Sequence, residues 1–220
     1  MSSLFGPRVA AFFGVAFAVL LFLGVASLDF PIEATDQEVL DWWSKDSNQT
    51  AALVSMAFVA FSGFALGLFV SFLRDRLNGT NGTAGNALFV VGLGAVAMLL
   101  ATAGARGAMA NALMNDEPLP GVDTLRFSAE LSHAIMEVAL MSVGVSIVLA
   151  AWAILKTRAF PAWSGWVSAV LGVLTVAGVV VVGPLVIPIT LLWALAMSVA
   201  VWRSGSEVAA PVLRQASRPA

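Results

Sequence analysis

Six long apolar stretches dominate this sequence and restrict its possible folds more than any other feature. A helix of about 20 apolar residues spans the hydrocarbon core of a bilayer and satisfies its own backbone hydrogen bonds there. The stretches cover residues 9–28, 51–73, 87–105, 129–155, 163–182 and 186–202. The sequence therefore predicts an all-α, polytopic membrane protein, a bundle of six transmembrane helices within residues 1–203.

The composition agrees with lipid as the main solvent of the chain. Hydrophobic residues make up 60% of the 220 residues and charged residues 11%, whereas a soluble domain carries about a quarter charged residues. The net charge of −2 gives no indication of nucleic-acid binding, and the lack of cysteine excludes disulfides and thiolate chemistry. Residues 204–220 are polar and predict a disordered cytoplasmic tail.

Two of the stretches have an alternative interpretation. Residues 9–28 resemble a cleaved signal peptide, but their apolar run exceeds the roughly 7–15 residues typical of one, which favours an uncleaved anchor. Only Gly183-Pro184 and Pro188 separate the last two stretches. One long kinked helix is the alternative there, but about 40 apolar residues exceed a single span, so we predict two helices and a tight turn.

Basic residues are distributed unevenly among the loops, which predicts the orientation of the chain. Short cytoplasmic loops carry the excess of Lys and Arg. With the N-terminus inside, eight of the 11 Lys and Arg residues are cytoplasmic, and the outer side holds Lys45, Arg126 and, at a helix end, Arg106. The inner set is Arg8, Arg74, Arg76, Lys156, Arg158, Arg203, Arg214 and Arg218. The acidic outer set is Asp29, Glu33, Asp36, Glu38, Asp41, Asp46, Asp116, Glu117 and Asp123. We predict a multi-pass protein of the bacterial inner membrane with both termini cytoplasmic.

The first outer loop contains a pattern typical of a short amphipathic helix. Thr35 and Glu38 have the spacing of a capping box, in which each residue satisfies a backbone N–H of the other. Trp42 and Trp43 suit the membrane interface, where an indole ring lies at headgroup level. We predict an interfacial helix with these tryptophans as anchors. The alternative is a lid or a partner contact.

Ionisable residues gather on one face of the fourth predicted span. Arg126, Glu130, His133 and Glu137 are spaced by four, three and four residues, which places them within an arc of about 60°. Arg106, at the outer end of the third span, is the best partner for them from another helix. Ionisable groups inside a membrane are costly, and each is a functional hypothesis by default.

Three hypotheses compete for this cluster. The first is a structural clasp, in which Arg106 forms a salt bridge with Glu130 or Glu137. The second is an outward-facing proton-coupled or small-molecule site. The third is a single metal ion held by Glu130, His133 and Glu137, although ligands from one helix are geometrically tight, and no other cofactor is predicted. The usual catalytic signatures are missing from the sequence, so we lean against an enzyme.

Small residues form two strips that predict close helix packing. Gly63 and Gly67 form a GxxxG motif in the second span. The strip in the fifth span is Gly165, Ser168, Gly172 and Thr175. The strips fit packing within the chain or between copies, so the expected partners are membrane lipids and, through these faces, a homo-oligomer or a second membrane protein.

Two short segments resemble a known group of proteins. Residues 156–166, KTRAFPAWSGW, and residues 36–43, DQEVLDWW, are similar to segments of uncharacterised six-helix actinobacterial membrane proteins of the DUF4386 type. The resemblance implies a six-helix bundle and transfers no catalytic residue. The leading functional hypothesis is a non-enzymatic accessory, scaffold or assembly component. The alternative is a transporter or sensor that uses the Glu130, His133 and Glu137 face.

Overall fold

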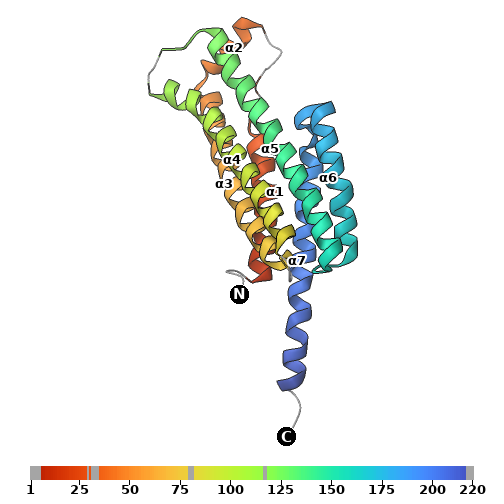
Figure 1. Ribbon diagram of the computed structural model, residues 1–220. Coiled ribbons are helices and arrows are strands. Elements are labelled where there is room, and N and C mark those ends of the chain that lie inside the picture. The colour runs from red at the N-terminus through yellow and green to blue at the C-terminus, as the bar shows by residue number, and fades with distance from the viewer. Residues whose placement is uncertain (1–5, 29, 31–34, 79–81, 116–117, 217–220) are drawn as a thin grey trace.

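The chain forms seven α-helices and one short 3-10 turn within the part that the structure describes (Figure 1). The computed structural model describes residues 6–28, 30, 35–78, 82–115 and 118–216, with residues 184–185 and 205–216 described by their backbone alone. The elements are α1 (Pro7–Ala26), α2 (Asp36–Trp43), α3 (Asp46–Leu77), α4 (Thr83–Met114), α5 (Val122–Thr157), α6 (Ala162–Val182), η1 (Gly183–Val186) and α7 (Ile187–Ala216). All the α-helices except α2 are long and apolar enough to cross a membrane. The predicted all-α, six-span fold is confirmed, and the chain is an integral membrane protein.

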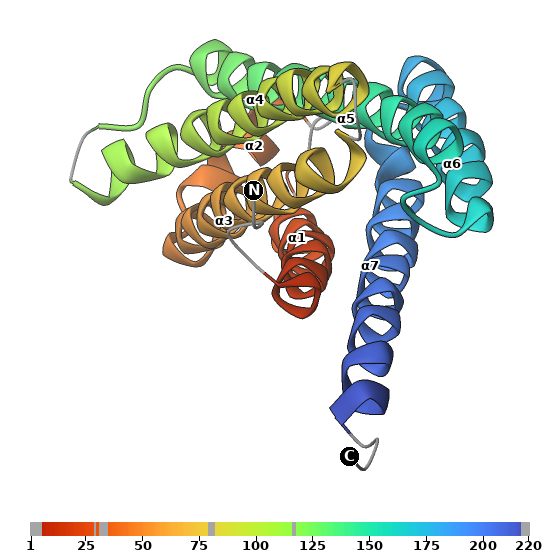
Figure 2. The same ribbon diagram turned by 60° about the horizontal axis from the view of Figure 1, so that its bottom comes forward.

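The six long helices pack in the order of a closed ring. Each of α3, α4, α5 and α6 contacts the next, α6 contacts α7, and α1 lies between α7 and α3 (Figure 2). Phe17, Phe69 and Trp193 are fully buried in the core of this ring. The rings of Phe69 and Trp193 meet edge to face at 6.1 Å, and Trp193 Nε1 donates to Ser168 Oγ at 3.0 Å. Large aromatic side chains with satisfied polar atoms therefore fill the centre.

Small residues allow neighbouring helices to pack closely. A Cβ added at Gly172 of α6 would lie 2.9 Å from the backbone nitrogen of Val148 in α5, and one at Gly144 would lie 3.1 Å from that of Val176. A Cβ at Gly63 of α3 would contact Leu99 of α4 at 3.5 Å. Both predicted strips thus pack against helices of the same chain, while a homo-oligomer stays a prediction.

The turn between the last two spans is as tight as the sequence predicts. Gly183 ends α6 with φ +58°, a left-handed conformation that favours glycine. The 3-10 turn η1 follows at once, and α7 begins at Ile187. Two helices, rather than one kinked helix, therefore occupy this part of the chain.

Three helices extend beyond their apolar stretches. α3 and α4 contain 32 residues each and α5 contains 36, so they are about 48–54 Å long, whereas a bilayer core is about 30 Å thick.

The short helix α2 packs beside the start of α3 and the start of α5, in a second apolar cluster. This cluster contains Val39, Trp43, Ala52, Ala110, Leu113 and Leu125. We call this end of the bundle, formed by α2, the end of α4 and the starts of α3 and α5, the α2 end.

The opposite end of the bundle is basic. α1 begins there, α3 and α5 end there, and α7 continues past it, as Figure 1 shows. Its described basic residues are Arg8, Arg74, Arg76, Lys156, Arg158 and Arg203. The sequence predicts a polar tail from residue 204. The apolar part of α7 does end at Ser204, but the helix itself continues to Ala216. Of the acidic loop residues, Asp29, Glu33, Asp116 and Glu117 lie outside the described residues.

Candidate functional site

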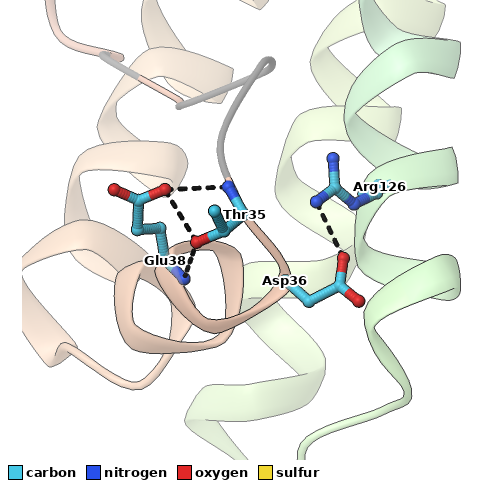
Figure 3. A network of polar contacts seen from close by, with 4 residues as sticks. All are labelled: Thr35, Asp36, Glu38 and Arg126. Carbon is cyan, nitrogen blue, oxygen red and sulfur yellow. Dashed lines mark hydrogen bonds and ion pairs between the residues drawn. The ribbon is translucent and has the colours of Figure 1, made fainter.

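The capping box predicted from Thr35 and Glu38 fixes the start of α2 (Figure 3). The Thr35 hydroxyl accepts from the Glu38 backbone N–H at 3.4 Å. Glu38 Oε2 in turn accepts from the Thr35 backbone N–H and hydroxyl, each at 2.8 Å. These two hydrogen bonds, the backbone one first, lower the pKa of Glu38 below its ordinary value. The first turn of α2 is therefore well defined at neutral pH.

An ion pair joins α2 to α5. Arg126 Nη2 donates to Asp36 Oδ1 at 2.9 Å, and Figure 3 shows the two side chains meeting between the helices. The Asp36 side chain is 73% exposed, so the pair orients α2 more than it stabilises the fold. Arg126, which the sequence places in the charged stripe, thus contacts α2.

The two tryptophans of α2 lie in different environments. Trp42 is half-buried, whereas Trp43 is 4% exposed and belongs to the second apolar cluster. Phe30 packs edge to face on Trp42 at 5.1 Å and lies 6.1 Å from Trp43. Trp43 is therefore placed inside the protein, where the sequence predicts an interfacial anchor, because α2 buries its apolar face against α3 and α5.

Arg106 connects three helices. Its Nη1 donates to Ser55 Oγ of α3 at 2.8 Å and to the Gly24 carbonyl of α1 at 3.3 Å. Ser55 Oγ donates to the same carbonyl at 2.5 Å. The last carbonyls of a helix lack backbone N–H partners. At the end of α1 the Leu28 backbone N–H donates to the Val25 carbonyl, not to the Gly24 carbonyl. The Gly24 carbonyl is therefore left to accept from side-chain donors.

The predicted clasp between Arg106 and α5 does not form. Arg106 makes no ion pair with a described acidic residue. Glu130 is exposed, and Glu137 lies near Gly183, where an added Cβ would be 2.8 Å from its Oε1. The reason is rotational: Arg106 faces α1 and α3, where a serine and a backbone carbonyl already supply acceptors.

The metal hypothesis is also not supported by the geometry. His133 Nε2 lies 3.9 Å from Glu137 Oε1, a loose contact. No three His, Asp or Glu side chains converge in a metal-binding group in the described segments. Of the predicted stripe, His133 and Glu137 thus lie within contact distance of each other.

A cavity of about 170 Å³ lies at the α2 end between α1, α2, α4 and α5. Its polar lining comes from Arg106, His133 and the hydroxyl-bearing Ser128 and Ser132, and its aromatic lining from Phe30 and Trp43. No acidic side chain is among the described residues that line it. The cavity therefore presents positive charge and hydrogen-bond donors between apolar walls.

Two donors beside this cavity lack acceptors. Arg106 Nε and Trp43 Nε1 are both buried and have no hydrogen-bond partner within the described part of the chain. Buried polar groups in folded proteins are nearly always hydrogen-bonded, so such exceptions call for an explanation. Each atom has almost no accessible surface, so a ligand in the cavity would supply an acceptor only after a small side-chain movement.

The face of α5 that lines the cavity differs from the predicted charged stripe. Ser128, Ser132 and Met136 follow one another at a spacing of four and share a helical face. His133 belongs to both faces, whereas Glu130 and Glu137 do not line the cavity. A search for charges alone misses this face, although the four-residue spacing of its serines is visible in the sequence.

Comparisons with protein-family models, curated proteins and solved structures find no match for this chain. The resemblance to the DUF4386 type thus stays a prediction. Functional inference rests on the geometry of the α2 end.

Proposed function

We propose that this integral membrane protein is a non-enzymatic sensor that binds a small molecule in the cavity at its α2 end. The observation that carries the proposal is the pair of buried donors without acceptors, Arg106 Nε and Trp43 Nε1, on residues that line one cavity. Ligand pockets combine mostly apolar walls with a few placed polar groups, as this one does.

The centre of the bundle favours sensing over proton-coupled transport. Between the cavity and the basic end, the core contains Leu140, Val143 and Ile147 of α5 together with Phe69 and Trp193. Most buried hydroxyl groups there bond to their own helices, as Thr102 does to the Met98 carbonyl, or to Trp193, whereas Thr190 Oγ1 has no partner in the described structure. A proton relay requires a chain of polar groups across the membrane, and the described core offers none.

In the proposed orientation, the α2 end lies on the extracytoplasmic side of the bacterial inner membrane and both termini lie in the cytoplasm. The clustering of Arg8, Arg74, Arg76, Lys156 and Arg203 at the opposite end supports it, because basic residues concentrate in cytoplasmic loops. The cavity would then sample molecules from the extracytoplasmic side. The leading sequence hypothesis, an accessory or scaffold protein, is the competing function if the cavity binds nothing.

The test uses the full chain in lipid nanodiscs and four probes with one ring: benzoate, benzamide, benzyl alcohol and benzylamine. At least one should raise the Tm of the wild-type chain. Ala129→Phe fills the cavity, which Ala129 lines, and should abolish the shift. Ala134→Phe, at an exposed position of the same helix, is the matched control and should retain it. Sensing through this cavity is wrong if no probe shifts the Tm, or if Ala129→Phe responds like the wild type.

A further inference from the structure

We infer that the ligand of the α2-end cavity is a small monocarboxylate with a flat apolar body, of the size of benzoate. The inference rests on the proposed function and names the chemical class of molecule that the site takes. Charge, donor placement and size each support it.

No described acidic side chain compensates the charge of Arg106. Its Nη1 contacts are a serine hydroxyl and a backbone carbonyl, both neutral. Burying a cation without a counter-charge is costly, and most so near the apolar interior of a membrane. A bound anion would supply the missing charge, whereas a cation would add to the penalty.

The other charged groups that the structure describes near the cavity do not reverse this preference. His133 lines the cavity and brings no negative charge to it. Its acidic neighbour Glu137 lies 3.9 Å away but does not line the cavity. Arg126 is engaged with Asp36 of α2. The ligand therefore meets Arg106 and His133 without an opposing carboxylate among the described lining residues.

The donors suit a carboxylate. A guanidinium presents its N–H groups in a planar fork that matches two carboxylate oxygens. Arg106 Nε has no acceptor, and Trp43 Nε1 is a second donor without one. One guanidinium with one indole N–H suits a monoanion better than a dianionic phosphate, which proteins bind with several cations or a helix N-terminus.

The cavity limits the size of the ligand. Its volume is about 170 Å³, and an apolar cavity of about 150 Å³ accommodates benzene. Phe30, Trp43 and Met136 contribute walls against which a flat ring can pack. A short branched acid or an aromatic acid fits this space, and a long acyl chain does not.

The experiment compares benzoate with its neutral isostere benzamide by calorimetric titration of the full chain in nanodiscs. We expect benzoate to bind at least about tenfold more tightly than benzamide, a difference of about 1.4 kcal/mol. Benzylamine should bind more weakly than either. Arg106→Gln should remove the preference for benzoate, and Arg74→Gln, which removes a cation at the basic end, should retain it.

Two results separate this inference from the proposed function. If benzamide binds as tightly as benzoate, the cavity is a binding site but the anion inference is wrong. If neither binds and no probe shifts the Tm, the proposed function is wrong as well. If Arg106→Gln does not fold, the comparison on the wild-type chain decides, and Trp43→Phe should weaken benzoate more than benzamide.

Discussion

The centre of the helical ring and the α2 end each bury a tryptophan, but they differ in whether its indole N–H has an acceptor. At the centre, Trp193 is fully buried, and its indole N–H donates to Ser168. At the α2 end, Trp43 is almost as buried, yet its indole N–H has no acceptor in the described structure and its ring borders a cavity. The two buried tryptophans thus distinguish a region in which the indole N–H is paired from one in which it is not.

The largest expected effect tests the centre. Trp193→Ala should lower the free energy of unfolding by about 3–5 kcal/mol, because it leaves a cavity in the core and removes the partner of Ser168. Unfolding by SDS titration from mixed micelles measures the difference. Trp166→Ala is the control, since Trp166 is 65% exposed on α6 and should change stability little. Equal losses in the two variants would remove the distinction between core and surface.

A smaller effect tests the close contact of α5 and α6. Gly172→Ala should destabilise by about 1–3 kcal/mol, because the new methyl group meets the backbone of Val148 and forces the helices apart. Gly94→Ala is the matched control, since nothing lies within 4 Å of an added Cβ there. It should be neutral or stabilising by up to about 1 kcal/mol through helix propensity. The same titration measures both, and a neutral Gly172→Ala would contradict the tight contact.

The smallest effect tests α2. Thr35→Ala removes the helix cap and should cost about 1 kcal/mol, confined to α2. Amide hydrogen exchange should become faster in α2 while that of Trp193 and its neighbours is unchanged. Thr50→Ala, at an exposed position of α3, is the control and should leave the exchange of α2 unaltered. Faster exchange throughout the bundle would show instead that α2 and the centre unfold together.

The capping box also predicts a pH dependence of α2. Hydrogen bonds from Thr35 lower the pKa of Glu38 from its ordinary value of 4.5, so the carboxylate form favours the folded helix. Its stabilising contribution is fully present above pH 4.5 and is lost as the pH falls through the lowered pKa. Exchange protection of α2 should decrease over that range, and Glu38→Gln should make it independent of pH.

The sequence predicts the elements of this molecule better than their contacts. Apolar length identifies the six spans, Thr35 and Glu38 predict the start of α2, and Gly183 predicts the last turn, because each signal is local. The rotation of a helix about its axis is not local. It decides that Arg106 faces Ser55 rather than Glu130, and it depends on how α4 packs between its neighbours.

The acceptor that Arg106 and Ser55 share cannot be identified from the sequence pattern. The Gly24 carbonyl is a backbone atom, and glycine at this position indicates only a close approach of helices. Trp43 likewise carries an interfacial signal in the sequence, although packing against α3 and α5 buries it. The candidate site therefore emerges only from the assembled bundle.

The contact between Arg106 and Gly24 has a consequence for how the chain is synthesised. The two residues are 82 positions apart, and Ser55 follows Gly24 by 31. When α1 enters the membrane, Ser27 Oγ is already available as a donor to the Gly24 carbonyl at 3.3 Å, but Ser55 and Arg106 have not yet been synthesised. The contacts that join the end of α1 to α3 and α4 therefore form only after the third crossing, and the three helices are expected to mature as a single folding unit during insertion.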